Sequence, residues 1–187
     1  MIAAAALLAV IPVIFSLKLV DFETAAVIGE RFLAVLGILL ISHIGNIEEN
    51  FDACDIVYSR TAPHVYTFVL RLMLAISVTF LSIGLIVLTA KASGGTFPLW
   101  EIWTGTFISA LLLGFFGMTV TSISKSHVSG YLLSFAYFMF EWFTAGRYTG
   151  RFYLMSLLEN NFPGKLNLLL PVLFLALLNI WIAAKKD

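Results

Sequence analysis

The sequence predicts an all-α integral membrane protein with six transmembrane helices and an amphipathic helix between the second and the third. Of its 187 residues, 60% are hydrophobic and only 12% are charged, whereas a soluble domain usually has about 25% charged residues. Apolar stretches also recur at lengths near the roughly 20 residues that a spanning helix needs. The expected spans form a single transmembrane domain over residues 1–187 and cover 2–20, 32–47, 64–90, 100–124, 128–146 and 166–184.

The first connector, residues 18–31, contains Asp21, Glu23 and Glu30. These charges predict a partly helical hairpin outside the apolar core of the bilayer. The second span is therefore expected to begin at Phe32. It is short, and such a span must tilt or thin the bilayer to cross it.

Residues 47–60 are predicted to form an amphipathic helix. Apolar side chains recur there at helical spacing of three and four, at Ile47, Phe51, Cys54 and Tyr58. Acidic side chains occupy another face, at Glu48, Glu49, Asp52 and Asp55. A helix of this kind lies flat on a membrane surface or binds a soluble partner. Arg60 and Pro63 follow it, and the proline favours the start of a new helix.

The second half of the chain alternates apolar spans with short polar connections. The segment Ser93–Pro98 is a turn, and Trp100 and Trp103 after it are typical of interfacial anchors. Residues 151–160 are too short to cross and are expected to form a helix on the outer surface. The last span is followed by the tail Lys185-Lys186-Asp187.

Composition and motifs exclude several classes of protein. The formal net charge is zero, with no basic patch of the kind that binds nucleic acid. The single cysteine, Cys54, excludes an internal disulfide framework. No catalytic serine, zinc or phosphate-loop motif occurs. The acidic face at 48–55 has the spacing to ligate a divalent cation, but no second carboxylate cluster supports it, so we expect no metal site and no catalytic residue.

Glu141 is the one acidic residue inside an apolar span, and Arg147 follows it shortly after. Intramembrane carboxylates are costly and often mark a transport pathway or a buried ion pair. The alternative, which we favour, places Glu141 at the interface beside Trp142, where it reaches water. Small residues around Gly114 and Gly117 also give the fourth span a face on which another helix can pack closely.

The order of these features resembles the permease subunits of ABC-2-type exporters, which are transmembrane subunits of ABC transporters. The resemblance lies in the acidic helix after the second span, the basic residue, the Thr-Ala-Pro turn and the arginine at the foot of the third span. The matching residues are Glu48, Glu49, Asp52, Arg60, Pro63 and Arg71. Six spans, a helical outer segment between the last two and a basic tail fit the same plan.

The resemblance implies that this chain is not an enzyme by itself. It implies a subunit of the cell membrane's ATP-driven export machinery, with no cofactor of its own, that moves an amphipathic or hydrophobic cargo such as a peptide, a drug or a lipid. ATP and magnesium would bind to a separate cytoplasmic ABC ATPase, which contacts the helix at 47–60, the coupling helix, through Glu48, Glu49, Asp52, Asp55, Arg60 and Pro63. The other implied partners are the lipid bilayer and a second permease copy, in a homodimer or heterodimer.

Two other functions are consistent with the same sequence. The first is a membrane enzyme that acts on lipid head groups with a divalent metal on the 48–55 acidic helix. The second is a non-catalytic membrane scaffold or immunity protein that binds a soluble partner through that helix. The enzyme predicts metal-dependent turnover by the isolated chain, and the scaffold predicts a partner without ATP dependence.

Overall fold

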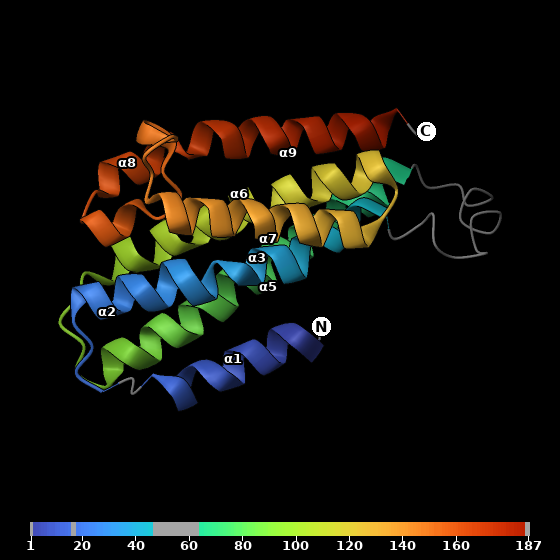
Figure 1. The fold of residues 1–187 in the computed structure, drawn as a ribbon. Coiled ribbons are helices and arrows are strands. Elements are labelled where there is room, and N and C mark those ends of the chain that lie inside the picture. Colours follow the sequence, from blue (N-terminus) through green and yellow to red (C-terminus); the bar gives the residue numbers. More distant parts are fainter. Residues whose placement is uncertain (1, 16–17, 47–63, 186–187) are drawn as a thin grey trace.

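The computed structural model describes residues 2–15, 18–46 and 64–185, and in these residues all regular secondary structure is helical (Figure 1). The elements, in chain order, are α1 (Ile2–Ile14), α2 (Phe22–Val27), the π-helix η1 (Ile28–Leu33), α3 (Val35–Ile41), the 3-10 helix η2 (Ser42–Asn46), α5 (His64–Ala92), α6 (Leu99–Ser124), α7 (His127–Thr144), the 3-10 helices η3 (Gly150–Phe152) and η4 (Ser156–Glu159), α8 (Phe162–Asn167) and α9 (Leu169–Ala184).

Within the described residues, four helical segments are long and apolar enough to cross a membrane, which indicates an integral membrane protein. They are Phe22–Gly45, Val65–Ala92, Leu99–Ser124 and Phe162–Ala184. The two other expected spans are helical but shorter: α1 has 13 residues and α7 has 18. The first helix ends at Ile14 rather than near residue 20, because Leu19 and Val20 instead bond to the backbone of Ser93 and Thr96.

The second apolar segment begins at Phe22, so the expectation of a connector up to Arg31 is wrong. The helix continues through Glu30 and Arg31 because both charges have partners inside the protein. Glu30 pairs with Lys165, and the Arg31 guanidinium lies 4.7 Å from the centre of the Trp142 ring. A buried charge is tolerated when it is paired and hydrogen-bonded.

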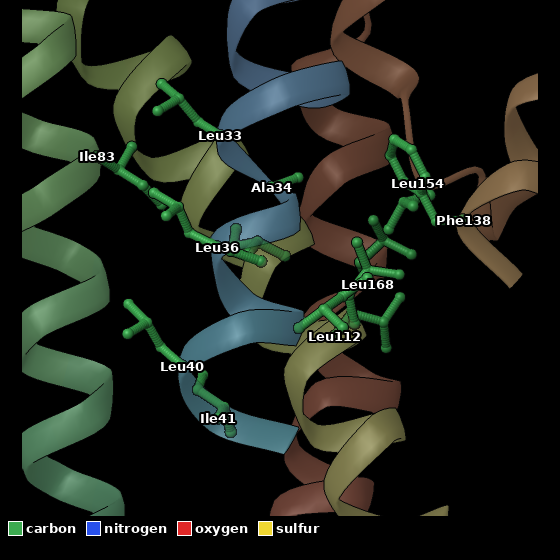
Figure 2. Packing of buried hydrophobic residues seen from close by; sticks show 14 of the residues in the cluster. Leu33, Ala34, Leu36, Leu40, Ile41, Ile83, Leu112, Phe138, Leu154 and Leu168 are labelled. Atoms are coloured by element: carbon green, nitrogen blue, oxygen red, sulfur yellow. The ribbon is translucent and has the colours of Figure 1, made fainter. Parts of the chain in front are cut away.

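Helix α6 lies at the centre of the bundle and packs against α3, α5, α7 and α9. The small-residue face expected on it is used within this chain. A Cβ added at Gly37 of α3 would lie 1.8 Å from the carbonyl oxygen of Ala110, and one at Gly114 would lie 2.7 Å from the Gly37 carbonyl oxygen. The two backbones therefore touch, as small residues allow in membrane bundles. Figure 2 shows buried leucines and isoleucines packed between the helices, among them Leu36, Ile41 and Ile83.

The segment between α7 and α8 is not the surface helix expected at 151–160. It consists of the short 3-10 helices η3 and η4, and the residues from Tyr153 to Leu157 are buried. We call residues 149–161 the returning segment, because the chain leaves α7, enters the bundle and comes back to α8. Irregular backbone of this kind is stable at membrane depth only where protein buries it and satisfies its polar groups.

Figure 1 shows how the helices are directed. The C-terminus, the end of η2 and the start of α5 lie at one end of the bundle, and the N-terminus points toward that end. The start of α2, the returning segment and α8 lie at the opposite end, which we call the α8 end. The residues predicted to contact the ATPase through the coupling helix lie outside the described residues: Glu48, Glu49, Asp52, Asp55, Arg60 and Pro63.

Candidate functional site

The most unusual feature of the α8 end is a fully buried ion pair. The Lys165 Nζ lies 2.5 Å from the Glu30 Oε2, and neither side chain is exposed. Ser109 of α6 joins the pair, because its hydroxyl lies 3.4 Å from both carboxylate oxygens. Three elements, η1, α6 and α8, thus meet at one set of charges. A pair that is this dry is costly to form and depends on the additional hydrogen bonds around it.

The same residues hold the backbone of the returning segment at Leu154. Its carbonyl oxygen accepts hydrogen bonds from Lys165 Nζ and from the Ser109 hydroxyl, the latter over 3.0 Å. Its amide donates to the Glu141 Oε2 over 3.3 Å. The peptide groups on both sides of Leu154 are therefore held by charged or polar side chains from three helices. This anchors the returning segment inside the bundle.

Local sequence explains how the two charged residues reach each other. Glu30 lies in η1, where the wider π-helical turn changes the direction of side chains; such turns occur often at functional sites. Lys165 lies in the first helical segment after Asn161, whose side-chain oxygen accepts a hydrogen bond from the Gly164 amide over 2.9 Å. This N-cap and Pro163 start α8 at a fixed position, and Lys165 then points inward.

The structure changes the interpretation of Glu141. The favoured expectation that it reaches water is wrong, because its side chain is fully buried. Its Oε2 accepts hydrogen bonds from the Thr149 hydroxyl over 3.1 Å and from the Leu154 amide. Arg147 is exposed, and among the described residues no ion pair joins it to Glu141. Glu141 thus belongs to the anchor of the returning segment, and a role in a transport pathway stays a prediction.

Sequence reasoning missed Glu30 and Lys165 as a site. The charges of residues 18–31 predict a connector that includes Glu30, and no motif surrounds Lys165 ahead of the last span. A signal was present, because a helix predicted from Phe22 would have placed an acid inside an apolar stretch, which by default marks a functional position. Its partner was not visible, since 135 positions separate the two residues.

Two cavities lie beside the returning segment, and neither Glu30 nor Lys165 lines them. The first, the apolar groove, has a volume of about 550 Å³ and is lined by Leu112, Phe116, Tyr137, Phe152, Leu168, Leu170, Pro171, Phe174 and Leu175. The second, the polar cavity, has a volume of about 370 Å³ and is lined by Gly150, Arg151, Tyr153, Ser156, Glu159, Asn161, Pro163, Gly164 and Asn167. Both volumes fall in the range of roughly 300–1,000 Å³ that is typical of ligand sites.

The polar cavity contains groups that favour a polar ligand. The hydroxyl of Ser156 is buried and has no hydrogen-bond partner among the described residues. Tyr153 is buried too, and burial raises the pKa of its phenol, as do the nearby carboxylates of Glu159 and Glu141. The phenol therefore stays protonated at neutral pH and keeps its proton for donation. In the described part of the chain, no group of three histidine, cysteine or acidic side chains is arranged to hold a metal ion.

Comparison with models of known protein families, with curated proteins and with solved structures found no match. The structure itself defines the class: an all-helical membrane protein with a returning segment anchored by a buried ion pair.

Proposed function

We propose that the chain is the permease subunit of an ATP-driven ABC exporter of the ABC-2 type, with six spans and a coupling helix at 47–60. In this proposal α1 and α7 cross the membrane together with the four longer helical segments. A short span crosses by thinning the bilayer locally or by pairing with another subunit. A second copy of the permease and a cytoplasmic ATPase complete the transporter.

The direction of the helices is the observation that carries this proposal. The end of η2 and the start of α5, which flank the acidic stretch, lie at the end of the bundle where the C-terminus also lies (Figure 1). A chain with six alternating spans would place its two termini and the connection between its second and third spans on one side of the membrane. That side would be the cytoplasm, where an ATPase can reach Glu48, Glu49, Asp52 and Asp55.

The returning segment adds support from the other end of the bundle. In the proposed topology it lies between the fifth and sixth spans on the outer side, where the resemblance predicts a helical outer segment. Its anchor joins α7, α8 and η1 through Leu154, Lys165 and Glu30. A movement of the coupling helix would be transmitted along α3 and α5 to helices that meet at this anchor. The two permease halves would then rock open toward the outside.

The test is copurification of the tagged chain, in mild detergent, from its own host. We expect an ATPase subunit with Walker motifs at a fixed stoichiometry. Reversal of charge in the double variant Glu49→Lys, Asp52→Lys should remove that subunit, because charge complementarity at a partner surface is lost. The matched control is Asp21→Lys, Glu23→Lys, which changes two exposed acids near the α8 end by the same charge.

An ATPase that is lost in the first variant and retained in the control supports the proposal. An intact, monodisperse sample that brings no ATPase contradicts it. The alternative is then the membrane enzyme with a divalent metal on the acidic helix, and turnover of the chain alone is measured with and without that metal.

A further inference from the structure

We propose that the apolar groove and the polar cavity together bind one phospholipid whose head group carries both a phosphate and an amine. The acyl chains would occupy the groove and the head group the cavity. The inference concerns the described helices alone and requires neither an ATPase nor a transport cycle. It goes beyond the proposed exporter function and is tested separately.

The two sites are lined by residues that are direct neighbours in the chain at two places. Phe152 lines the groove, while its neighbours Arg151 and Tyr153 line the cavity. On the other side, Leu168 lines the groove and its neighbour Asn167 lines the cavity. A ligand whose apolar part is joined directly to its polar part fits this arrangement.

The groove is open to the lipid side of the bundle. Leu170 and Phe174 of α9 line it and are 68% and 65% exposed in the isolated chain. Other parts of the protein cover little of the apolar surface of α9, so in a membrane the surrounding lipid covers it. Phe116 and Tyr137 stand at 5.5 Å between ring centres and give the groove a firm aromatic wall. Lipid tails are the apolar groups that reach such a groove in a bilayer.

The polar cavity lies where a head group would lie. Its lining residues run from Gly150 to Asn167, on both sides of Phe162, where the last apolar segment begins at the α8 end of the bundle. Exposed aromatic rings, Trp100 at 67% and Tyr148 at 75%, border the apolar segments, as amphipathic rings do at the membrane interface. The lipid would thus come from the leaflet at the α8 end, which is the outer leaflet in the proposed topology.

The charges of the cavity select the head group. Arg151 and Glu159 both line it and are exposed, and neither forms an ion pair within the part of the chain that is described. Guanidinium binds phosphate through paired hydrogen bonds, and a carboxylate binds an ammonium group. The buried Ser156 hydroxyl, which has no partner among the described residues, offers a further hydrogen bond. A head group such as phosphoethanolamine matches all three groups, and an anionic head group without an amine leaves Glu159 unpaired.

The experiment uses the full-length chain in lipid nanodiscs with a phosphatidylethanolamine that carries a diazirine in one acyl chain. After illumination, the labelled peptides are identified by mass spectrometry. We expect labels on peptides that contain groove residues, and competition by unlabelled phosphatidylethanolamine about tenfold more effective than by phosphatidylglycerol. That factor corresponds to one charge-assisted contact. Labels spread evenly over the outer face of α9, without competition, would show bulk lipid only and overturn the proposal.

Two pairs of variants locate the site. Leu175→Trp narrows the groove and should reduce specific labelling about tenfold, while Leu177→Trp, on the exposed face of the same helix and outside the groove, should leave it unchanged. Glu159→Gln should abolish the preference for phosphatidylethanolamine over phosphatidylglycerol, while the exposed Arg147→Gln should preserve it. Because Glu159 is exposed, its variant remains informative where Leu175→Trp does not fold.

Equal labelling in Leu175→Trp and Leu177→Trp would overturn the assignment of the groove. A preference unchanged by Glu159→Gln would overturn the assignment of the head group. Crosslinks between two copies of the chain through the groove residues would also contradict the proposal, because a second permease copy would then be the occupant.

Discussion

Lys165 and Glu30 form an ion pair of 2.5 Å across 135 positions of the sequence, and both side chains are fully buried. The pair joins the start of the second apolar segment to the start of the last one. The Leu154 carbonyl shares the lysine, so the pair also fixes the returning segment. One contact therefore closes the α8 end of the bundle.

The ion pair predicts a strong and asymmetric effect of mutation. Lys165→Met should lower the free energy of unfolding by about 3–5 kcal/mol, because it leaves the Glu30 carboxylate buried without a counter-charge. The double variant Lys165→Met, Glu30→Leu should recover much of that loss. Thermal unfolding in detergent micelles measures both, with Lys18→Met, an exposed lysine near the same end, as control. A double variant as unstable as the single one would contradict this explanation.

Substitutions of Glu141 and of Arg147 should differ in their effects on stability. Glu141→Leu removes the acceptor of the Leu154 amide and the Thr149 hydroxyl, and we expect a loss of about 1–3 kcal/mol for the unsatisfied donors. Hydrogen exchange of the returning segment should accelerate as well. Arg147→Leu should change neither quantity, since the described residues hold no ion pair between them. Similar destabilisation by the two variants would instead indicate a Glu141–Arg147 pair.

The close contact between α3 and α6 predicts that a Gly→Ala substitution there destabilises the protein, the reverse of its effect in an exposed helix. In an exposed helix, Gly→Ala stabilises by roughly 0.5–1 kcal/mol. At Gly37 the new methyl would meet the Ala110 carbonyl oxygen at 1.8 Å, so the helices must separate. We expect Gly37→Ala to destabilise by about 1–3 kcal/mol. Ala136→Val, which adds methyl groups on an exposed face of α7, should have little effect in the same melting experiment. An unchanged melting temperature for Gly37→Ala would refute the close contact.

The buried phenol of Tyr153 predicts that the stability of the protein depends on pH in the alkaline range. Its pKa is raised above the ordinary value of 10.0, first by burial and then by nearby carboxylates. The folded state therefore binds its phenolic proton more tightly than the unfolded state does, and stability is lost as pH rises from 10 through the folded pKa. Tyr153→Phe should make this loss less steep. Melting temperatures measured from pH 8 upward for both proteins test it, and parallel curves would contradict the prediction.

Much of the helical content followed from apolar patterning. The helices near 64–90, 100–124, 128–146 and 166–184 occur close to the expected bounds, because long apolar runs leave few alternatives in a membrane. The start of the second segment did not follow, since Glu30 and Arg31 indicated a connector. Their partners, Lys165 and Trp142, come from distant parts of the chain, and local patterning contains no information about such pairs.

The burial of the returning segment also depends on distant partners, so local patterning did not predict the candidate site. The residues from Tyr153 to Leu157 are mostly apolar, which is consistent with a helix on a membrane surface as well as with burial. The segment is buried because Lys165, Ser109 and Glu141 form hydrogen bonds with the carbonyl and amide of Leu154. The two cavities depend on that burial and were not predictable. The predicted coupling helix, residues 47–60, lies outside the described residues and stays a prediction.

The sequence by itself determined that this is a helical membrane protein, because composition and the length of apolar runs fix how a chain meets a bilayer. The tertiary structure decided which charges belong inside. Glu30, Glu141 and Lys165 are buried because side chains and backbone from separate helices converge on them. Burial of a charge depends on partners in three dimensions, and the cost of desolvation is repaid only once the helices have packed.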